Sequence, residues 1–124
     1  MTEASLYQRL GGYDVVASIT DGFLNGVTND PDIGYYWAVD SLDTKKRDRQ
    51  LIVDFLCEAA GGPTFYTGRD MTTSHTGLGI TDAEYNIMLT HCRAALDESG
   101  VPEDAKSDVC SFIESLRGEI VGDA

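Results

Sequence analysis

Basic residues are scarce in this sequence, which has nine Lys and Arg against 21 Asp and Glu and a formal net charge of −12. Binding to nucleic acids or to anionic lipid headgroups depends on Lys and Arg that neutralise phosphate groups. We therefore expect neither a nucleic-acid partner nor a membrane surface. Long apolar runs are also missing, because no stretch reaches the roughly 18 apolar residues that a membrane span needs. The N-terminal segment lacks the apolar core of a signal peptide, which favours a cytoplasmic protein.

Cysteines and catalytic motifs are equally sparse. Cys57, Cys92 and Cys110 are widely spaced and form no C-x-x-C pair, which excludes a zinc knuckle or a thioredoxin-type site. We expect them to be buried as small hydrophobic side chains. No phosphate loop, H-E-x-x-H motif or EF-hand loop is present. No Ser/His/Asp or Cys/His arrangement can be assembled, so the sequence disfavours hydrolases and nucleotide-dependent enzymes.

The apolar residues that are present recur at helical spacing, and no segment reads as a strand. The sequence predicts an all-α fold in one domain, residues 1–124, with a short helix at 5–10 and long helices at 13–28, 44–60, 82–98 and about 102–120. Thr81 and Glu84 have the spacing of a capping box at the start of the fourth of these helices. Gly22 and Gly26 lie on one face of the first long helix, which predicts that another helix crosses it closely.

The stretch 61–80 holds five glycines, Pro63 and one of only two histidines, His75. Connections between helices usually need about two to eight residues, so this longer one indicates a functional segment. Spacing alone would make either His75 or His91 a structural residue. A single imidazole beside an apolar, aromatic-rich region is, however, what iron protoporphyrin requires, because the iron takes one axial nitrogen and the ring needs apolar walls. A C-x-x-C-H motif is absent, so we expect non-covalent haem b.

Three blocks of the sequence carry a family resemblance. S-L-Y-Q-R-L-G-G at 5–12, G-G-P-T-F-Y-T-G-R-D-M at 61–71 and H-T-G-L-G-I-T at 75–81 resemble the signature blocks of group I truncated haemoglobins, in the same order. The resemblance runs nearly end to end. It implies a truncated globin fold, a two-over-two helical sandwich around haem, with His75 as the proximal ligand of the iron.

The same resemblance implies the residues that surround the haem. Trp37 falls where the family carries the phenylalanine that stacks on the ring, and Arg69, Lys45 and Lys46 are candidate partners for the two propionates. The remaining residues expected to line the cofactor are Tyr36, Phe55, Leu56, Met71, Leu78, Ile80, Tyr85 and Met88.

The distal side departs from the family. Leu24 stands where many members carry a tyrosine that bonds the gas, and Ile52 stands where they carry a glutamine, with Asp48 one turn earlier. A donor to the gas is then lost, unless Tyr36 or Gln50 replaces it. The other possibility is an apolar pocket with fast ligand release.

These observations predict a haem protein that reversibly binds a diatomic ligand, oxygen or nitric oxide, with oxygen binding or transport as its role. The resemblance also allows a nitric oxide dioxygenase or peroxidase-type enzyme served by a reductase, and a haem-based gas or redox sensor. A helical interaction module that has lost haem is the remaining alternative, and the presence of His75 counts against it. We expect a structural role for His91.

Overall fold

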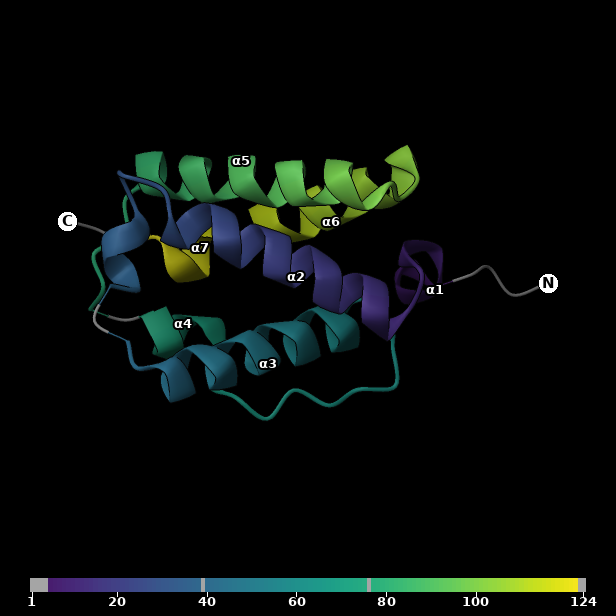
Figure 1. Ribbon diagram of the computed structural model, residues 1–124, viewed down its shortest axis with the longest axis horizontal. Coiled ribbons are helices and arrows are strands. Elements are labelled where there is room, and N and C mark those ends of the chain that lie inside the picture. The colour runs from purple at the N-terminus through teal and green to yellow at the C-terminus, as the bar shows by residue number, and fades with distance from the viewer. Residues whose placement is uncertain (1–4, 39, 76, 123–124) are drawn as a thin grey trace.

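The computed structural model describes residues 5–38, 40–75 and 77–122, and over these residues the chain is helical and contains no strand (Figure 1). The elements in chain order are α1 (Leu6–Leu10), α2 (Tyr13–Thr28), the 3₁₀ helix η1 (Gly34–Tyr36), α3 (Leu42–Ala59), α4 (Met71–His75), α5 (Asp82–Ser99), α6 (Glu103–Ser115) and α7 (Arg117–Ile120).

The long helices form two packed pairs. Helix α2 packs against both α3 and α5, and α5 packs against α6, so that α2 lies between α3 on one side and the α5–α6 pair on the other (Figure 1). Helix α4 packs against α7. This arrangement confirms the predicted two-over-two helical sandwich.

Local capping explains where the helices begin and end. The Thr81 side chain accepts from the Glu84 amide and the Glu84 side chain accepts from the Thr81 amide, which confirms the predicted capping box of α5. Helix α5 stops at Gly100, whose φ of 73° is a left-handed conformation that glycine adopts without strain.

Helix α3 differs from its predicted start at residue 44. It begins at Leu42, because the hydroxyl of Ser41 accepts from the amide of Thr44 at 3.1 Å and caps the helix two residues earlier.

The last predicted helix, about 102–120, is divided at Leu116. The Leu116 amide bonds to the carbonyl of Ile113, three residues back, so the helix tightens and ends before α7 begins.

The prediction that glycines allow a close helix crossing on α2 is confirmed. A Cβ built on Gly26 would lie 2.5 Å from Nδ1 of His91, and one on Gly22 would lie 3.4 Å from Cβ of Ala95. His91 also bonds Oδ2 of Asp30 through Nε2 at 2.7 Å. His91 therefore joins α5 to the turn that follows α2, which agrees with the structural role expected for it.

A continuous core lies between the sandwich layers, and it contains two of the three cysteines. Its buried members are Leu10, Val16, Ala17, Ile19, Val53, Cys57, Ala60, Cys92, Ala95, Leu96, Val101, Ala105 and Val109. Burial raises the pKa of the Cys92 thiol to about 12, so this thiol is inert at neutral pH. Cys110 is only half-buried. None of the described helices is both long and apolar enough to cross a membrane.

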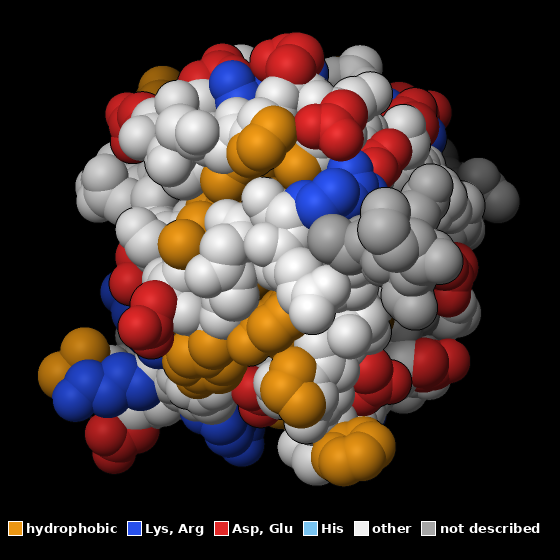
Figure 2. All heavy atoms as spheres, turned by 90° about the vertical axis from the view of Figure 1, so that its right-hand side faces the viewer, with side chains coloured by type: hydrophobic (Ala, Val, Ile, Leu, Met, Phe, Trp, Pro, Cys, Tyr) orange, Lys and Arg blue, Asp and Glu red, His pale blue; other side chains and the backbone are white. Residues whose placement is uncertain are grey.

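The surface carries an excess of acidic side chains, which predominate over basic ones on the face in Figure 2. Five of the nine basic residues pair with carboxylates, namely Arg9, Arg49, Arg93, Lys106 and Arg117. Within the described part of the chain, Lys45, Lys46, Arg47 and Arg69 form no such pair, and all four are exposed.

Candidate functional site

His75 is the last residue of α4, a helix that the sequence did not predict. The helix begins after Asp70, whose side chain accepts from the Thr73 amide at 3.1 Å and whose carbonyl accepts from the Ser74 amide at 2.9 Å. This cap allows a single turn to form in a glycine-rich segment. His75 is thereby held in helical geometry instead of in a loop.

The imidazole of His75 is oriented by the helix that carries it. Its Nδ1 lies 2.8 Å from the carbonyl oxygen of Met71 and 2.9 Å from the hydroxyl oxygen of Ser74. Because a carbonyl can only accept, Nδ1 carries the hydrogen. In the neutral imidazole Nε2 then carries the lone pair, and this is the nitrogen that can bind a metal.

The aromatic residues Tyr36 and Trp37 lie at the end of η1. Their rings meet edge to face with centroids 6.2 Å apart, and Tyr36 stacks on Tyr35 at 4.3 Å. The Tyr36 hydroxyl donates to Oε1 of Glu84 at 2.9 Å. Burial, together with hydrogen bonds to Tyr35 and Glu84, raises the Tyr36 pKa far above its ordinary value, so this phenol stays protonated.

Phe55 of α3 belongs to a second aromatic group. Its ring lies 5.2 Å from that of Tyr66 and 5.9 Å from that of Phe112, measured between centroids. Leu56 lines an apolar cavity of about 90 Å³ together with residues of α1, α2, α5 and α6, among them Phe112. Phe112 of α6 thus meets Phe55 at its ring and shares the cavity wall with Leu56.

The other residues predicted to line the cofactor differ in how far they are buried. Tyr85 is fully buried, donates its hydroxyl to the Ile113 carbonyl and has the Arg117 guanidinium 4.8 Å above its ring. Burial raises its pKa to about 12. Met71, Ile80 and Met88 are half-buried, and Leu78 is 48% exposed.

On the predicted distal side, Leu24, Asp48 and Ile52 are all half-buried. Burial and the nearby charge of Asp40 raise the pKa of Asp48, and Arg47 opposes this shift. Gln50 lies on the exposed side of α3, where Nε2 donates to the Tyr13 hydroxyl at 2.8 Å and to Oδ1 of Asp54 at 2.9 Å. The two substitute donors, Tyr36 and Gln50, are thus already bonded to other groups.

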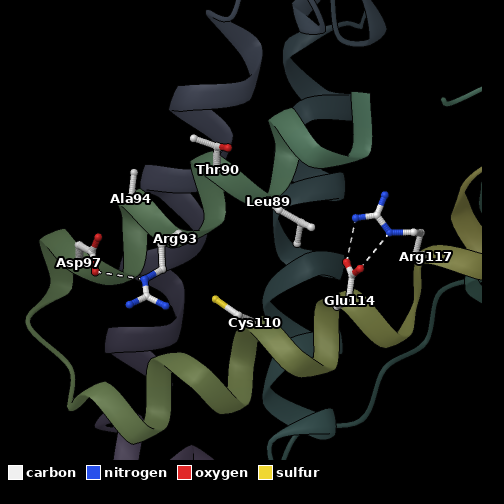
Figure 3. A pocket seen from close by; sticks show the side chains of 8 residues that line it. All are labelled: Leu89, Thr90, Arg93, Ala94, Asp97, Cys110, Glu114 and Arg117. Carbon is white, nitrogen blue, oxygen red and sulfur yellow. Dashed lines mark hydrogen bonds and ion pairs between the residues drawn. The ribbon is translucent and has the colours of Figure 1, made fainter. Parts of the chain in front are cut away.

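A separate groove of about 670 Å³ runs between α5 and the α6–α7 segment (Figure 3). Arg93 pairs with Asp97 at 3.5 Å, and Arg117 pairs with Glu114 at 2.9 Å. The charged side chains of the groove therefore neutralise one another, and no histidine lines the groove. The groove is lined by Leu89, Thr90, Arg93, Ala94, Asp97, Cys110, Glu114 and Arg117. His75 does not line this groove.

Sequence reasoning missed three groups that organise the site. Glu84 was predicted only as a capping residue, and the contacts of Asp30 and of the Met71 carbonyl were not predicted. The half-buried Tyr36 was the available signal for Glu84, because a half-buried phenol needs an acceptor.

Comparison with known proteins places this geometry in a family. The model of the bacterial-like globin family matches residues 5–121. The group 1 truncated hemoglobin GlbN of Mycolicibacterium paratuberculosis is 31% identical over 117 residues, which cover 94% of this chain and 84% of that protein.

Solved structures agree on the fold. The truncated hemoglobin of Tetrahymena pyriformis in its Fe(III) form has a TM-score of 0.88 and 24% identity, covering 97% of this chain and all of the other. The 2/2 hemoglobin of Synechococcus sp. PCC 7002, solved with covalently attached heme, has a TM-score of 0.86 and 24% identity, covering 95% and 98%. The chain therefore belongs to the bacterial-like globin family, among the group I truncated haemoglobins.

Proposed function

We propose that the protein binds iron protoporphyrin through His75 and reversibly takes up a diatomic gas, oxygen or nitric oxide, on the other side of the ring. Membership of the globin family implies a haem cofactor and a gas ligand. The observation that supports His75 is the hydrogen bond from its Nδ1 to the Met71 carbonyl, which leaves Nε2 for the metal. When bound, haem would supply an iron atom that can take up a small gas.

The donor set fits a metal that a macrocycle already holds. Among residues 5–38, 40–75 and 77–122, no group of three or more His, Cys, Asp or Glu side chains could hold a bare ion. One imidazole suffices when a porphyrin supplies the equatorial ligands. A flat apolar ring would also cover Leu78, which is otherwise 48% exposed.

The other residues proposed to contact haem are of two kinds, apolar side chains for the ring and basic side chains for the propionates. Trp37 stacks on the ring, and Met71, Ile80 and Met88 contribute apolar wall. Lys45, Lys46 and Arg69 are exposed cations without a carboxylate partner in the described part of the chain. Because two of them lie near the start of α3, where positive charge opposes the helix dipole, an anion such as a propionate would stabilise them.

We favour reversible binding over nitric oxide dioxygenation. Oxygen must be stabilised by a hydrogen-bond donor for that reaction, yet Leu24 and Ile52 are apolar, and Tyr36 and Gln50 donate to other groups. A gas or redox sensor would use the same binding chemistry. We place the protein in the cytoplasm, with a reductase that keeps the iron ferrous as its partner.

Adding haem to the purified apoprotein tests the proposal. The wild-type protein should give a sharp Soret band, and His75→Gly should lose or broaden it, because the axial nitrogen is removed. Free imidazole should restore the band in His75→Gly. The matched control is His91→Gln, which keeps a donor for Asp30 and should retain the wild-type spectrum.

A wild-type spectrum in His75→Gly would contradict the assignment of the ligand. The mode of attachment is checked by extraction into acidified butanone, which removes non-covalent haem. Haem that stays with the protein would instead match the attachment named for the Synechococcus protein.

A further inference from the structure

One carboxylate, that of Glu84, receives hydrogen bonds from two adjacent tyrosines. The Tyr36 hydroxyl donates to Oε1 at 2.9 Å, and the Tyr35 hydroxyl donates to Oε2. The rings of the two tyrosines stack with centroids 4.3 Å apart. The bonds from Tyr35, from the Thr81 amide and from Tyr36 hold the pKa of Glu84 below its ordinary value. The carboxylate is therefore charged at neutral pH, and its bonds to the phenols are charge-assisted.

Helix capping does not require this arrangement. A capping glutamate needs one oxygen for the amide of the N-cap residue, and Oε1 of Glu84 already bonds the Thr81 amide at 3.0 Å. Oε2 accepts a hydrogen bond from Tyr35, a residue that is 57% exposed. An exposed phenol gains little from an ordinary surface hydrogen bond, so its fixed position calls for another explanation.

The segment that carries these tyrosines is also tied to α5 at its other end. Asp30 accepts from the amides of Asp32 and Ile33 through Oδ1, at 2.8 and 3.3 Å, and bonds His91 through Oδ2 at 2.7 Å. Glu84 and His91 are seven residues apart on α5, which is about two turns or roughly 10 Å along one face of the helix. We call residues 30–37 the strap, because α5 holds it at both ends.

We propose that Glu84 is a positioning residue that holds the strap against α5 and so fixes Tyr36 and Trp37 at the edge of the cofactor site. The Trp37 ring meets the Tyr36 ring edge to face at 6.2 Å, so the position of Tyr36 sets that of Trp37. The consequence for the cofactor rests on the proposed function, whereas the attachment of the strap to α5 does not. Loss of the carboxylate should release the strap at its tyrosine end, while His91 still holds Asp30.

Glu84→Gln is the central variant, because glutamine can still cap the helix but offers one neutral oxygen where two phenols need acceptors. We expect haem transfer from Glu84→Gln to excess apomyoglobin to be about tenfold faster than from wild type, the size of one charge-assisted hydrogen bond. Tyr36→Phe should have a similar effect. The double variant should lose haem no faster than Glu84→Gln alone, because Tyr36→Phe removes a bond that Glu84→Gln has already weakened.

Thr81→Ala is the matched control. It removes the hydroxyl that accepts from the Glu84 amide at 3.1 Å and donates to Glu84 Oε1 at 3.3 Å, and so weakens the cap, but it leaves both tyrosine bonds in place. It should lower the melting temperature without accelerating haem loss. Equal acceleration in Thr81→Ala, or unchanged haem loss in Glu84→Gln, would overturn the positioning role.

Amide hydrogen exchange in the haem-free protein provides an independent measurement. Exchange in the strap should accelerate in Glu84→Gln and stay at the wild-type rate in Thr81→Ala. Equal strap exchange in Glu84→Gln and wild type would overturn the attachment itself. If the protein bound no haem at all, the proposed function would fail, together with the effect on the cofactor. The exchange result would still decide whether Glu84 holds the strap.

Discussion

Under the proposed function, we expect the side chain at position 24 to determine whether the gas-binding face has a hydrogen-bond donor near the ligand. Leucine at this position cannot donate, and it is half-buried on α2. Iron-bound oxygen carries partial negative charge. A donor placed beside it therefore forms a charge-assisted hydrogen bond, which stabilises the bound gas by about 1.5–3 kcal/mol.

Leu24→Tyr should therefore slow oxygen release about tenfold to a hundredfold, measured by stopped-flow mixing of the oxygenated protein with an oxygen scavenger. Leu24→Phe is the control, since it adds the same ring without the hydroxyl. If both variants release oxygen at one rate, residue 24 does not face the ligand, and the distal pocket must be assigned to other residues.

At the scale of the elements, the crossing of α2 and α5 depends on two glycines that tolerate a side chain to different degrees. A Cβ on Gly26 would lie 2.5 Å from Nδ1 of His91, and the hydrogen bond to Asp30 prevents that ring from moving away freely. A Cβ on Gly22 would lie 3.4 Å from Cβ of Ala95, which is an ordinary contact.

Gly26→Ala should lower the free energy of unfolding by about 1–3 kcal/mol, the usual cost of overpacking. Gly22→Ala should leave the stability unchanged or raise it by up to about 1 kcal/mol, because alanine is the better helix former. Urea unfolding of both variants, in the same haem-free state, is the measurement. Equal destabilisation of the two would show that the crossing has no special contact at Gly26.

For the whole molecule, the net charge of −12 opposes compact folding through repulsion among acidic side chains. Five basic residues are paired, but these pairs are solvent-accessible, and such pairs stabilise a protein by only about 0–1 kcal/mol each. Added salt should therefore weaken the repulsion among the acidic side chains more than the attraction within the ion pairs.

We expect the melting temperature at pH 7 to rise when sodium chloride increases from about 20 to about 500 mM, which shortens the Debye length several-fold. Differential scanning calorimetry is suitable. Chloride is preferable to sulfate, because sulfate stabilises folded proteins by exclusion from their surface whatever their charge. A falling melting temperature would mean that the surface ion pairs outweigh the repulsion.

The contacts that the sequence determined are mainly local. Apolar spacing predicts the long helices, and the Thr81–Glu84 capping box and Gly100 define α5, because each depends on residues within one turn. The α4 helix was not predicted, because the stretch 61–80 is rich in glycine and the capping role of Asp70 was not recognised in it. The family and the two-over-two fold also followed from the sequence, since three signature blocks stand in order along it.

Tertiary structure alone decided how the site is held. Glu84 meets Tyr36 across 48 positions and His91 meets Asp30 across 61, so no local pattern could reveal either contact. The same applies to Phe55, whose ring meets those of Tyr66 and of Phe112 on α6. Sequence determined which residue types are available, because caps and helical periods are short-range. Helix packing determined their partners, because those contacts exist only once the layers have come together.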